Sequence, residues 1–347
     1  MLVGGAAINR AFGRRIALLD DGRMYEPGVF YCKDAFEGLG VMDRLSDGEL
    51  RGGVIAERRA EAVAERDTPK ATPAPEPAPA RAGRESLRRD VTVPEPPFLG
   101  ARLVEGIDPA AVFALMDERS LYKLSWGGKG VRGEEWERLL ADDFRPRRER
   151  MQAEAVAQGW IVPRAAYGFF RAAADGDDTV VLDGAGDELG RFEFPRQDRH
   201  DRLCISDYLR ETGDGADVIA LQIVTAGAEA TAHIDALQAA EEYSEAYFAH
   251  GLAVEAAEGL AEYVHRRILA ELGLEAGRGR RYSWGYPACP DLEQHELVLQ
   301  LLPTAADLGI ELSAAYQFIP EQTTAAIVIH HPQAVYFSAR RGVRSGE

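Results

Sequence analysis

A proline-rich segment divides this 347-residue chain into two unequal parts. Between residues 68 and 84, five prolines are separated mostly by alanine and charged residues, with no apolar periodicity. Such a stretch cannot bury a core, so we interpret it as an extended, semi-stiff linker. We expect a partial fragment at 1–48, a charged helix and the linker at 49–92, and one large domain at 93–343.

The composition suits a folded protein that binds small molecules or other proteins. The 46% of apolar residues suffices for a substantial core, and the net charge of -17 argues against nucleic acid or an anionic membrane surface as partners. No apolar run approaches the roughly 18 to 20 residues of a bilayer span, and the first 15 residues lack a signal-peptide pattern. We therefore predict a cytoplasmic protein.

Helical and strand patterns after the linker come in clusters rather than in strict alternation. Helical patterns occupy 110–117, 133–140 and 228–272, and strand patterns occupy 179–182, 191–194, 218–224 and 325–329. This clustering favours an α+β domain with a largely antiparallel sheet and flanking helices.

The part before the linker is too short for a complete domain. A Gly-rich turn after Val3 leads into a helical pattern, and a short strand follows at 28–31. These elements make about one and a half βα units, which is a partial α/β fragment rather than a closed sheet.

The glycine-rich stretch VVLDGAG at 180–186 imitates the turn of a Rossmann-type methyltransferase. That motif requires a following helix, whose free amides receive the ligand. Here the next residues, RFEFP at 191–195, alternate like a strand and end at proline. We therefore predict a β-hairpin and no nucleotide site at this position.

The segment RGRRYSWGYPACP at 278–290 has the composition of a rigid loop that faces a ligand. Its two prolines fix φ, and Gly285 lets a ligand approach the backbone closely. Arg281 can clamp an amino-acid carboxylate through two parallel hydrogen bonds. Residue types alone leave open that Arg281 forms a surface ion pair and that Trp284 and Tyr286 are ordinary core aromatics.

The spacing R-x-x-x-G-Y at 281–286, continued by PACP, resembles the S-adenosylmethionine-binding signature of the activation domain of cobalamin-dependent methionine synthase. Further matches to that family follow in the same order: VPEPPFLG at 93–100, YGFF at 167–170, FPRQ at 194–197, HGLAVEAAEGLAEYVH at 250–265 and HHPQAVYFS at 330–338. The resemblance covers the whole large domain, and it implies S-adenosylmethionine as a cofactor.

The resemblance also implies the residues of a binding site. Arg281 would hold the methionyl carboxylate, the backbone around Gly285 and Tyr286 would lie along the cofactor, and Tyr336 would contact it.

Two acidic residues are implied as further contacts. Asp117 would contact the amino-acid moiety, although its spacing to Lys129 differs from the family by about one residue. Glu258 on the long helix would face the site, with Glu255 and Glu262 as competitors for that role.

No catalytic side chain and no metal site are expected. A sulfonium methyl leaves without proton transfer, so the reaction needs no general base. His330 and His331 are adjacent on a strand, so they point to opposite faces, and no third ligand is spaced to join them. We interpret both as structural.

The beginning of the chain resembles the last part of the same enzyme's cobalamin-binding domain, in LVGGAAIN at 2–9 and YCKDAFEGL at 31–39. The D-x-H-x-x-G motif of the lower axial ligand is absent, since no histidine precedes His200. A three-cysteine zinc site and a folate barrel are missing as well. The resemblance therefore implies a methyltransferase component that cannot complete the methionine synthase cycle alone.

The implied reaction is reductive methylation, in which a one-electron donor reduces cob(II)alamin while the methyl of S-adenosylmethionine passes to cobalt. The implied partners are a cobalamin-binding domain or subunit and a flavodoxin-like or ferredoxin-like electron donor. Arg145, Arg147 and Arg148, or Arg278 and Arg280, offer a basic landing patch for that donor. A non-catalytic binding or docking module and a truncated synthase remain as alternatives.

Overall fold

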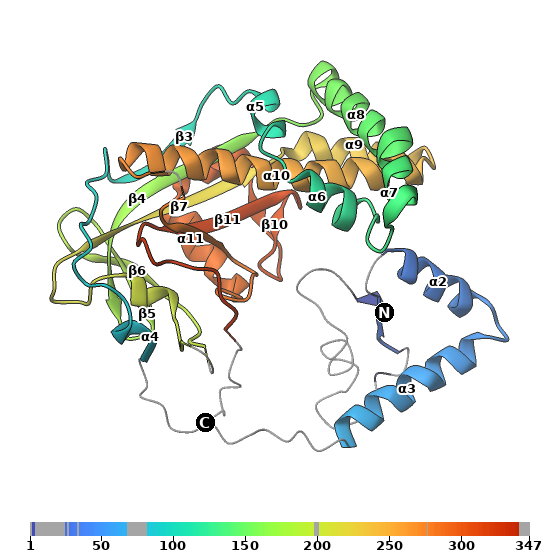
Figure 1. The fold of residues 1–347 in the computed structure, drawn as a ribbon, viewed down its shortest axis with the longest axis horizontal. Helices are drawn as coiled ribbons and strands as arrows, with labels where there is room; N and C mark the ends of the chain where they lie inside the picture. The colour runs from blue at the N-terminus through green and yellow to red at the C-terminus, as the bar shows by residue number, and fades with distance from the viewer. Residues whose placement is uncertain are drawn as a thin grey trace. The chain divides into compact units, whose positions relative to one another are not determined.

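The computed structural model describes residues 2–3, 25, 28–32, 35–67, 82–197, 201–275 and 277–339. The chain forms two compact units, Met1–Glu76 and Pro77–Glu347 (Figure 1). Within the described ranges, no helix has both the length and the apolar character needed to cross a membrane.

The described residues of the first unit form a short parallel strand pair and two helices. β1 (Leu2–Val3) pairs with β2 (Phe30–Tyr31), and α2 (Ala35–Ser46) and α3 (Arg51–Asp67) follow. Its buried core contains Phe30, Cys32, Val41 and Val54. The strand predicted at 28–31 is confirmed, whereas the helix predicted after the Gly-rich turn lies outside the described residues.

A seven-stranded antiparallel sheet forms the centre of the second unit. The short helix α4 (Ala82–Glu85) precedes the sheet in the sequence. The strands run in the order β6-β5-β4-β7-β11-β8, and β3 shares one edge of β4 with β5. Their bounds are β3 (Gly100–Val104), β4 (Arg164–Asp175), β5 (Asp178–Leu182), β6 (Glu188–Glu193), β7 (Asp217–Thr225), β8 (Arg280–Ser283) and β11 (Thr323–Ile329). The predicted antiparallel sheet is confirmed, and a separate small hairpin joins β9 (Glu311–Leu312) to β10 (Phe318–Ile319).

The glycine-rich stretch at 180–190 is a hairpin, as predicted. β5 and β6 pair antiparallel, and no helix follows their turn. The turn is closed by the carboxylate of Asp183, which accepts hydrogen bonds from the backbone N–H groups of Ala185 at 2.8 Å and Asp187 at 2.9 Å.

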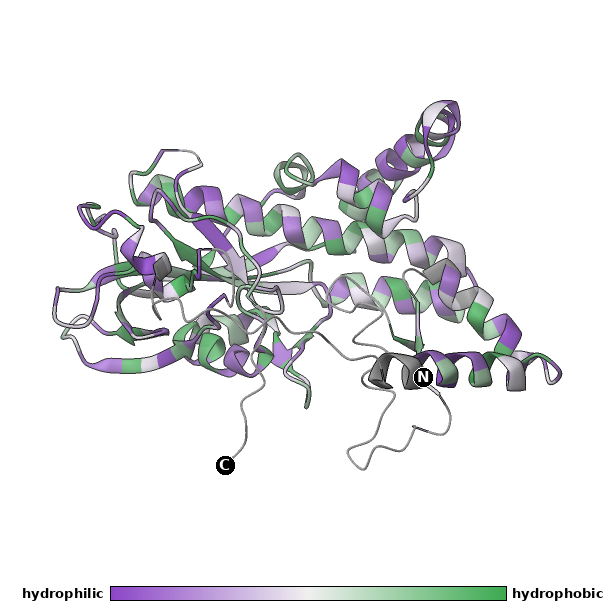
Figure 2. Cartoon of the chain, turned by 60° about the horizontal axis from the view of Figure 1, so that its bottom comes forward, coloured by the Kyte–Doolittle hydropathy of each residue, from purple (hydrophilic) through white to green (hydrophobic). Residues whose placement is uncertain are grey.

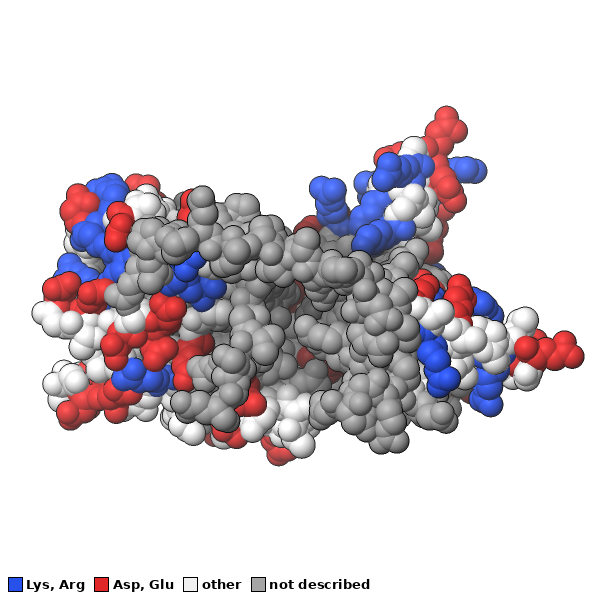
Figure 3. Space-filling model, turned by 90° about the horizontal axis from the view of Figure 1, so that it is seen from below, with Lys and Arg blue, Asp and Glu red and all other residues white. Residues whose placement is uncertain are grey.

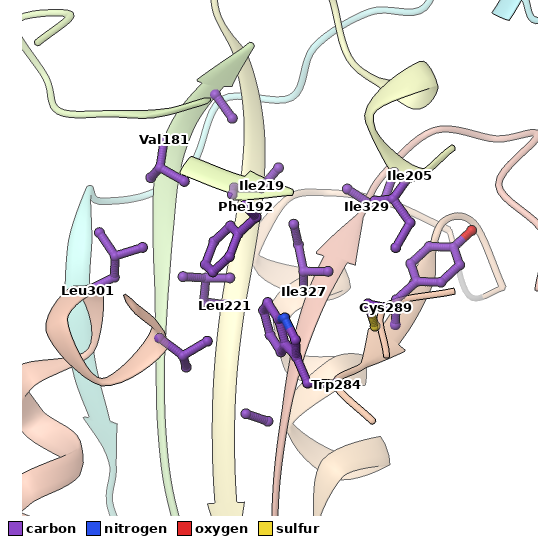
Figure 4. Close-up of a cluster of buried hydrophobic side chains, with 14 of the residues drawn as sticks. Val181, Phe192, Ile205, Ile219, Leu221, Trp284, Cys289, Leu301, Ile327 and Ile329 are labelled. Atoms are coloured by element: carbon purple, nitrogen blue, oxygen red, sulfur yellow. The ribbon is translucent and has the colours of Figure 1, made fainter. Parts of the chain in front are cut away.

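Side chains alternate between the two faces of the sheet, as the period of a strand requires. One face packs against α10 (Tyr243–Glu271) through Tyr167, Phe169, Val224, Val328, Leu260, Val264 and Ile268. The other face packs against α11 (His295–Leu301) and the loop after β8, through residues that include Phe192, Leu221, Ile327, Trp284 and Leu301 (Figure 4). The sheet is therefore covered on both sides.

A group of helices packs around the first half of α10, with the bulky aromatic residues Trp126, Phe144 and Phe248 at its centre. These elements are α5 (Pro109–Phe113), α6 (Glu118–Ser120), α7 (Gly133–Leu139), α8 (Arg145–Gln158), α9 (Ala228–Ala239) and the π-helical turns η1 (Leu121–Ser125) and η2 (Leu140–Phe144). Figure 2 shows polar and apolar residues on each long helix, as expected when one side is covered.

Two helix predictions need correction. The single helix predicted over 228–272 is two helices, because Glu241 adopts a left-handed φ of 62° between α9 and α10. The helix predicted over 110–117 ends at Phe113, and Asp117 instead caps the next helix. In both places the local sequence continues a helical composition while the backbone turns.

Small residues allow α10 to lie close to its neighbours. A Cβ atom at Gly259 would come within 2.8 Å of the carbonyl oxygen of Val112, so α5 approaches the helix backbone there. Glu258, the adjacent residue, is thus on a helix whose position is fixed by tight packing.

Candidate functional site

Arg281 lies on the edge strand β8, which pairs with β11. Its neighbour Tyr282 is buried in the core on the α11 side and donates a hydrogen bond to the carbonyl oxygen of Val335 at 2.7 Å. Because adjacent strand residues point to opposite faces, the Arg281 side chain lies on the α10 side. There its Nη2 donates to Oε2 of Glu258 at 3.1 Å.

The guanidinium of Arg281 is mostly buried, with 15% of its side chain exposed. Its Nη1 is also buried and donates to no acceptor within the described ranges. A buried N–H group without an acceptor costs free energy, so this atom favours the arrival of an oxygen ligand. A carboxylate suits the planar guanidinium best.

Glu255 lies one helical turn before Glu258 on α10 and is almost fully buried. Its Oε1 accepts a hydrogen bond from Oγ of Ser125 at 3.0 Å. Burial, together with the neighbouring carboxylates of Glu258 and Asp117, raises the pKa of this carboxyl to about 7. Glu262, by contrast, forms an ion pair with Arg266, so the two competitors of Glu258 differ in surroundings.

Asp117 caps the first turn of α6. Its Oδ1 accepts from the backbone N–H of Arg119 at 2.9 Å, and its Oδ2 accepts from Oγ of Ser120 at 2.7 Å. The hydrogen bond from Ser120 lowers the pKa of Asp117. Both oxygens therefore accept hydrogen bonds within the turn, and Asp117 acts on Glu255 as a neighbouring carboxylate.

The loop after β8 is a tight turn around Gly285, whose φ is +86°. The Gly285 N–H donates to the carbonyl oxygen of Cys289 at 2.9 Å, and the Cys289 N–H donates to that of Tyr286 at 3.0 Å. Trp284 is buried, as expected of an ordinary core aromatic, whereas 53% of Tyr286 is exposed. The Glu258 carboxylate raises the pKa of Tyr286, which therefore lies beside the Arg281–Glu258 pair.

Tyr336 lies beside the edge strand β8, near Tyr282 and Arg280. Its ring centroid is 5.8 Å from that of Tyr282, and the guanidinium carbon of Arg280 is 5.9 Å from its centre. The Ala339 N–H donates to the carbonyl oxygen of Pro287 at 3.1 Å, which ties the segment after Tyr336 to the loop. The structure thus brings Arg281, Glu258 and Tyr286 together and places Tyr336 at the loop's border.

The two adjacent histidines have separate structural contacts. Nε2 of His330 lies 2.5 Å from Oδ1 of Asp217, and Nε2 of His331 lies 3.1 Å from the carbonyl oxygen of Arg88. The His330 ring therefore contacts the start of β7, and the His331 ring contacts the segment before β3.

The two predicted basic patches differ in how their charges are compensated. Arg147 forms ion pairs with Asp143 and Glu245, and Arg148 forms one with Glu118. Figure 3 shows basic and acidic side chains interleaved over the described parts of the surface in view.

The second patch bonds to the backbone instead. Arg278 donates to the carbonyl oxygen of His330 at 3.3 Å, and Arg280 donates to those of Gly277 at 2.8 Å and Gly279 at 2.6 Å. Among the described residues neither arginine forms an ion pair, which makes this patch the better candidate for an acidic partner.

The antiparallel sheet covered on both faces, with an arginine-bearing edge strand and a glycine–tyrosine turn, defines an α+β domain with a candidate ligand site at the edge of its sheet. Residues 102–343 match the family model described as "Vitamin B12 dependent methionine synthase, activation domain". The chain belongs to this family.

Two relatives named methionine synthase support the assignment. The protein of Mycobacterium tuberculosis (strain ATCC 25618 / H37Rv) is 35% identical over 385 residues, covering 97% of this chain and 32% of that protein. The protein of Mycobacterium leprae (strain TN) is 34% identical over 386 residues, with the same coverage of 97% and 32%. The chain thus spans about a third of the length of these curated relatives.

A solved structure supports the fold. The crystal structure of the MetH reactivation domain bound to AdoHcy matches with a TM-score of 0.65 and 23% identity, over 74% of this chain and 87% of that one. The predicted α+β fold and the predicted family are therefore both confirmed.

Proposed function

We propose that the chain binds S-adenosylmethionine beside Arg281 and Glu258 and supports the reductive methylation of cobalamin in methionine biosynthesis, as a methyltransferase component. The relatives named methionine synthase and the AdoHcy-bound reactivation domain support this proposal. The single observation that carries it is the Arg281–Glu258 pair at 3.1 Å.

This ion pair fits the amino-acid end of the ligand. A zwitterion can exchange partners with an ion pair, its carboxylate going to the guanidinium of Arg281 and its ammonium to the carboxylate of Glu258. The buried Nη1 of Arg281 supplies a second donor for the ligand carboxylate. Each charge then keeps an opposite charge beside it.

The remaining residues position the ligand rather than react with it. The turn held by Gly285 is closed by backbone hydrogen bonds and is therefore formed before binding. Tyr286 and Tyr336 expose aromatic faces that can line the ligand and exclude water. Since a sulfonium methyl leaves without proton transfer, these residues need only hold the methyl group in position.

Cobalamin, when bound on a partner domain or subunit, supplies the cobalt that receives the methyl group. No histidine precedes His200, so the first unit offers no axial imidazole of its own. We therefore propose that a complete cobalamin-binding domain must be present for activity. We further propose that this chain does not run the full methionine synthase cycle alone.

The electron donor is proposed to be an acidic flavodoxin-like or ferredoxin-like protein that docks at Arg278 and Arg280, whose hydrogen bonds go to carbonyl oxygens. A cytoplasmic location is proposed with it, on the absence of a membrane-spanning helix from the described residues.

A methyl-transfer assay tests the proposal. Labelled S-adenosylmethionine, a supplied cobalamin protein and a one-electron reductant are combined with the wild-type chain or with Arg281→Ala. We expect labelled methylcobalamin with the wild type only. Binding without transfer by the wild type would favour the alternative, a non-catalytic S-adenosylmethionine-binding or corrinoid-docking module. Absence of binding would contradict both.

A further inference from the structure

Glu255 is a buried carboxyl group that the sequence resemblance does not assign to the site. Only 7% of the residue is exposed, and its Oε1 accepts a hydrogen bond from Oγ of Ser125 at 3.0 Å. Glu255 and Glu258 are three residues apart on α10, so they share one side of the helix. Glu258 binds Arg281, so Glu255 lies on the helical turn next to that pair.

The groups that face Glu255 come from three other elements and from α10 itself. Asp117 at the start of α6 and Glu258 on α10 act on it as neighbouring carboxylates. Ser125 comes from η1, and Glu255 in turn raises the pKa of Tyr286 in the loop after β8.

The nearby cations do not neutralise this carboxyl. Arg281 is bonded to Glu258. Lys123, on the same turn as Ser125, directs its Nζ to the carbonyl oxygens of Gly128 at 3.2 Å and Val131 at 2.8 Å. Among the described residues, the site therefore holds more carboxyl groups than cations, and its net charge depends on whether Glu255 is protonated.

The ligand and its product differ in charge at one atom. S-adenosylmethionine has a sulfonium, and S-adenosylhomocysteine has a neutral thioether, while their amino-acid and nucleoside parts are the same. Arg281 can balance the ligand carboxylate and Glu258 the ammonium. The sulfonium is then the remaining charge. Both oxygens of Asp117 are bonded within its own turn, so Glu255 is the neighbouring carboxyl whose charge can change.

We propose that Glu255 is a specificity-determining residue whose ionised form makes the site prefer the cationic methyl donor over its neutral product. This inference rests on the proposed function, because it concerns the same site. Burial raises the pKa of Glu255 to about 7, so its charge changes within the physiological pH range. The preference for the methyl donor accordingly increases as pH rises through 7.

The test is calorimetric titration of both ligands into the whole chain between pH 6 and pH 8. The readout is the ratio of the two dissociation constants, in which the titration of the shared amino-acid end cancels. For the wild type we expect the preference for S-adenosylmethionine to rise about tenfold over this range. An ionised Glu255 carboxylate several ångströms from the sulfonium would attract it by an energy of this size. For Glu255→Gln we expect a ratio that does not change with pH.

Two further variants allow the test to be decided without relying on Glu255→Gln alone. Ser125→Ala removes a hydrogen bond that favours the ionised carboxyl, so the rise should move to higher pH. Glu262→Gln, on the same helix but paired with Arg266, should keep the wild-type profile. If Glu255→Gln does not fold, the shift in Ser125→Ala decides the question.

The outcomes separate this inference from the proposed function. If both ligands bind but the wild-type ratio is constant, or if Glu255→Gln keeps the rise, the role of Glu255 is overturned and the proposed function stands. If neither ligand binds the wild type at any pH, the proposed function is overturned, and the role of Glu255 falls with it.

Discussion

Arg281 of strand β8 and Glu258 of helix α10 form an ion pair with Nη2 and Oε2 3.1 Å apart, although the two residues are 23 positions apart in the sequence. The pair joins the edge of the sheet to the helix that covers it. It also gives the site one positive and one negative group in fixed positions before any ligand arrives, which is the arrangement an amino-acid zwitterion requires.

Removing the negative member of this pair should weaken ligand binding. We expect Glu258→Gln to raise the dissociation constant for S-adenosylmethionine about tenfold, because the ligand ammonium loses a charged acceptor. Titration calorimetry measures the change. Glu262→Gln, one turn further along α10, should bind like the wild type, and equal losses in both variants would show that the position of Glu258 has no special role.

The backbone conformation at position 285 favours glycine. With φ at +86° and Leu292 Cδ2 at 3.3 Å from an added Cβ, Gly285→Ala should lower the free energy of unfolding by about 1 kcal/mol. It should also weaken ligand binding, since the turn shifts. Gly184→Ala is the matched control, because its Cβ would meet only Leu99, at 3.6 Å. Thermal unfolding of the two variants should differ, and identical melting temperatures would refute the strain.

Tyr336 is expected to affect binding but not stability. Its side chain is 67% exposed, so Tyr336→Ala should leave the melting temperature nearly unchanged while weakening the ligand roughly fivefold through loss of an aromatic contact. Tyr243→Ala removes an equally exposed tyrosine, at 66%, from the start of α10. A loss of affinity in both variants, or in neither, would remove Tyr336 from the site.

The raised pKa of Glu255 predicts a pH-dependent stability. Its carboxyl binds a proton more tightly in the folded state, with a pKa of about 7, than in the unfolded chain, where the pKa is about 4.5. The free energy of unfolding therefore falls as pH rises from about 5 to 7. Glu255→Gln should be more stable than the wild type at pH 8 by roughly 2 kcal/mol, with little difference at pH 5.

Denaturant unfolding at the two pH values measures this difference. Glu137→Gln on α7 is the control for loss of an acidic side chain at an exposed position, and it should change the stability by less than about 0.5 kcal/mol at either pH. If the difference in the free energy of unfolding between Glu255→Gln and the wild type is the same at pH 5 and pH 8, the raised pKa is contradicted.

The parts of the fold that sequence patterns predicted are those with continuous apolar runs. β7 and β11 are central strands rich in valine and isoleucine, and their positions were predicted nearly to the residue. Strand β4 was missed, although it pairs on both sides, because its alanine-rich sequence RAAYGFFRAAAD has little intrinsic preference for a strand. Tertiary pairing overrides composition there.

The site shows the same division. Arg281, Gly285 and Tyr286 form a compact motif, so sequence alone could single them out. The burial of Glu255 could not be predicted, because Glu255, Glu258 and Glu262 have similar neighbours in the sequence and only tertiary packing distinguishes them. The capping role of Asp117 likewise depends on where α5 ends, which composition does not reveal.

The most direct test of the account is titration calorimetry of S-adenosylmethionine into the wild-type chain, Arg281→Ala and Arg266→Ala. Arg266 is an exposed arginine of α10 in an ion pair with Glu262, so it controls for loss of a positive charge. The account predicts wild-type affinity for Arg266→Ala and about a hundredfold weaker binding for Arg281→Ala, the loss of a charge-assisted double hydrogen bond. Equal affinity of Arg281→Ala and the wild type would contradict it.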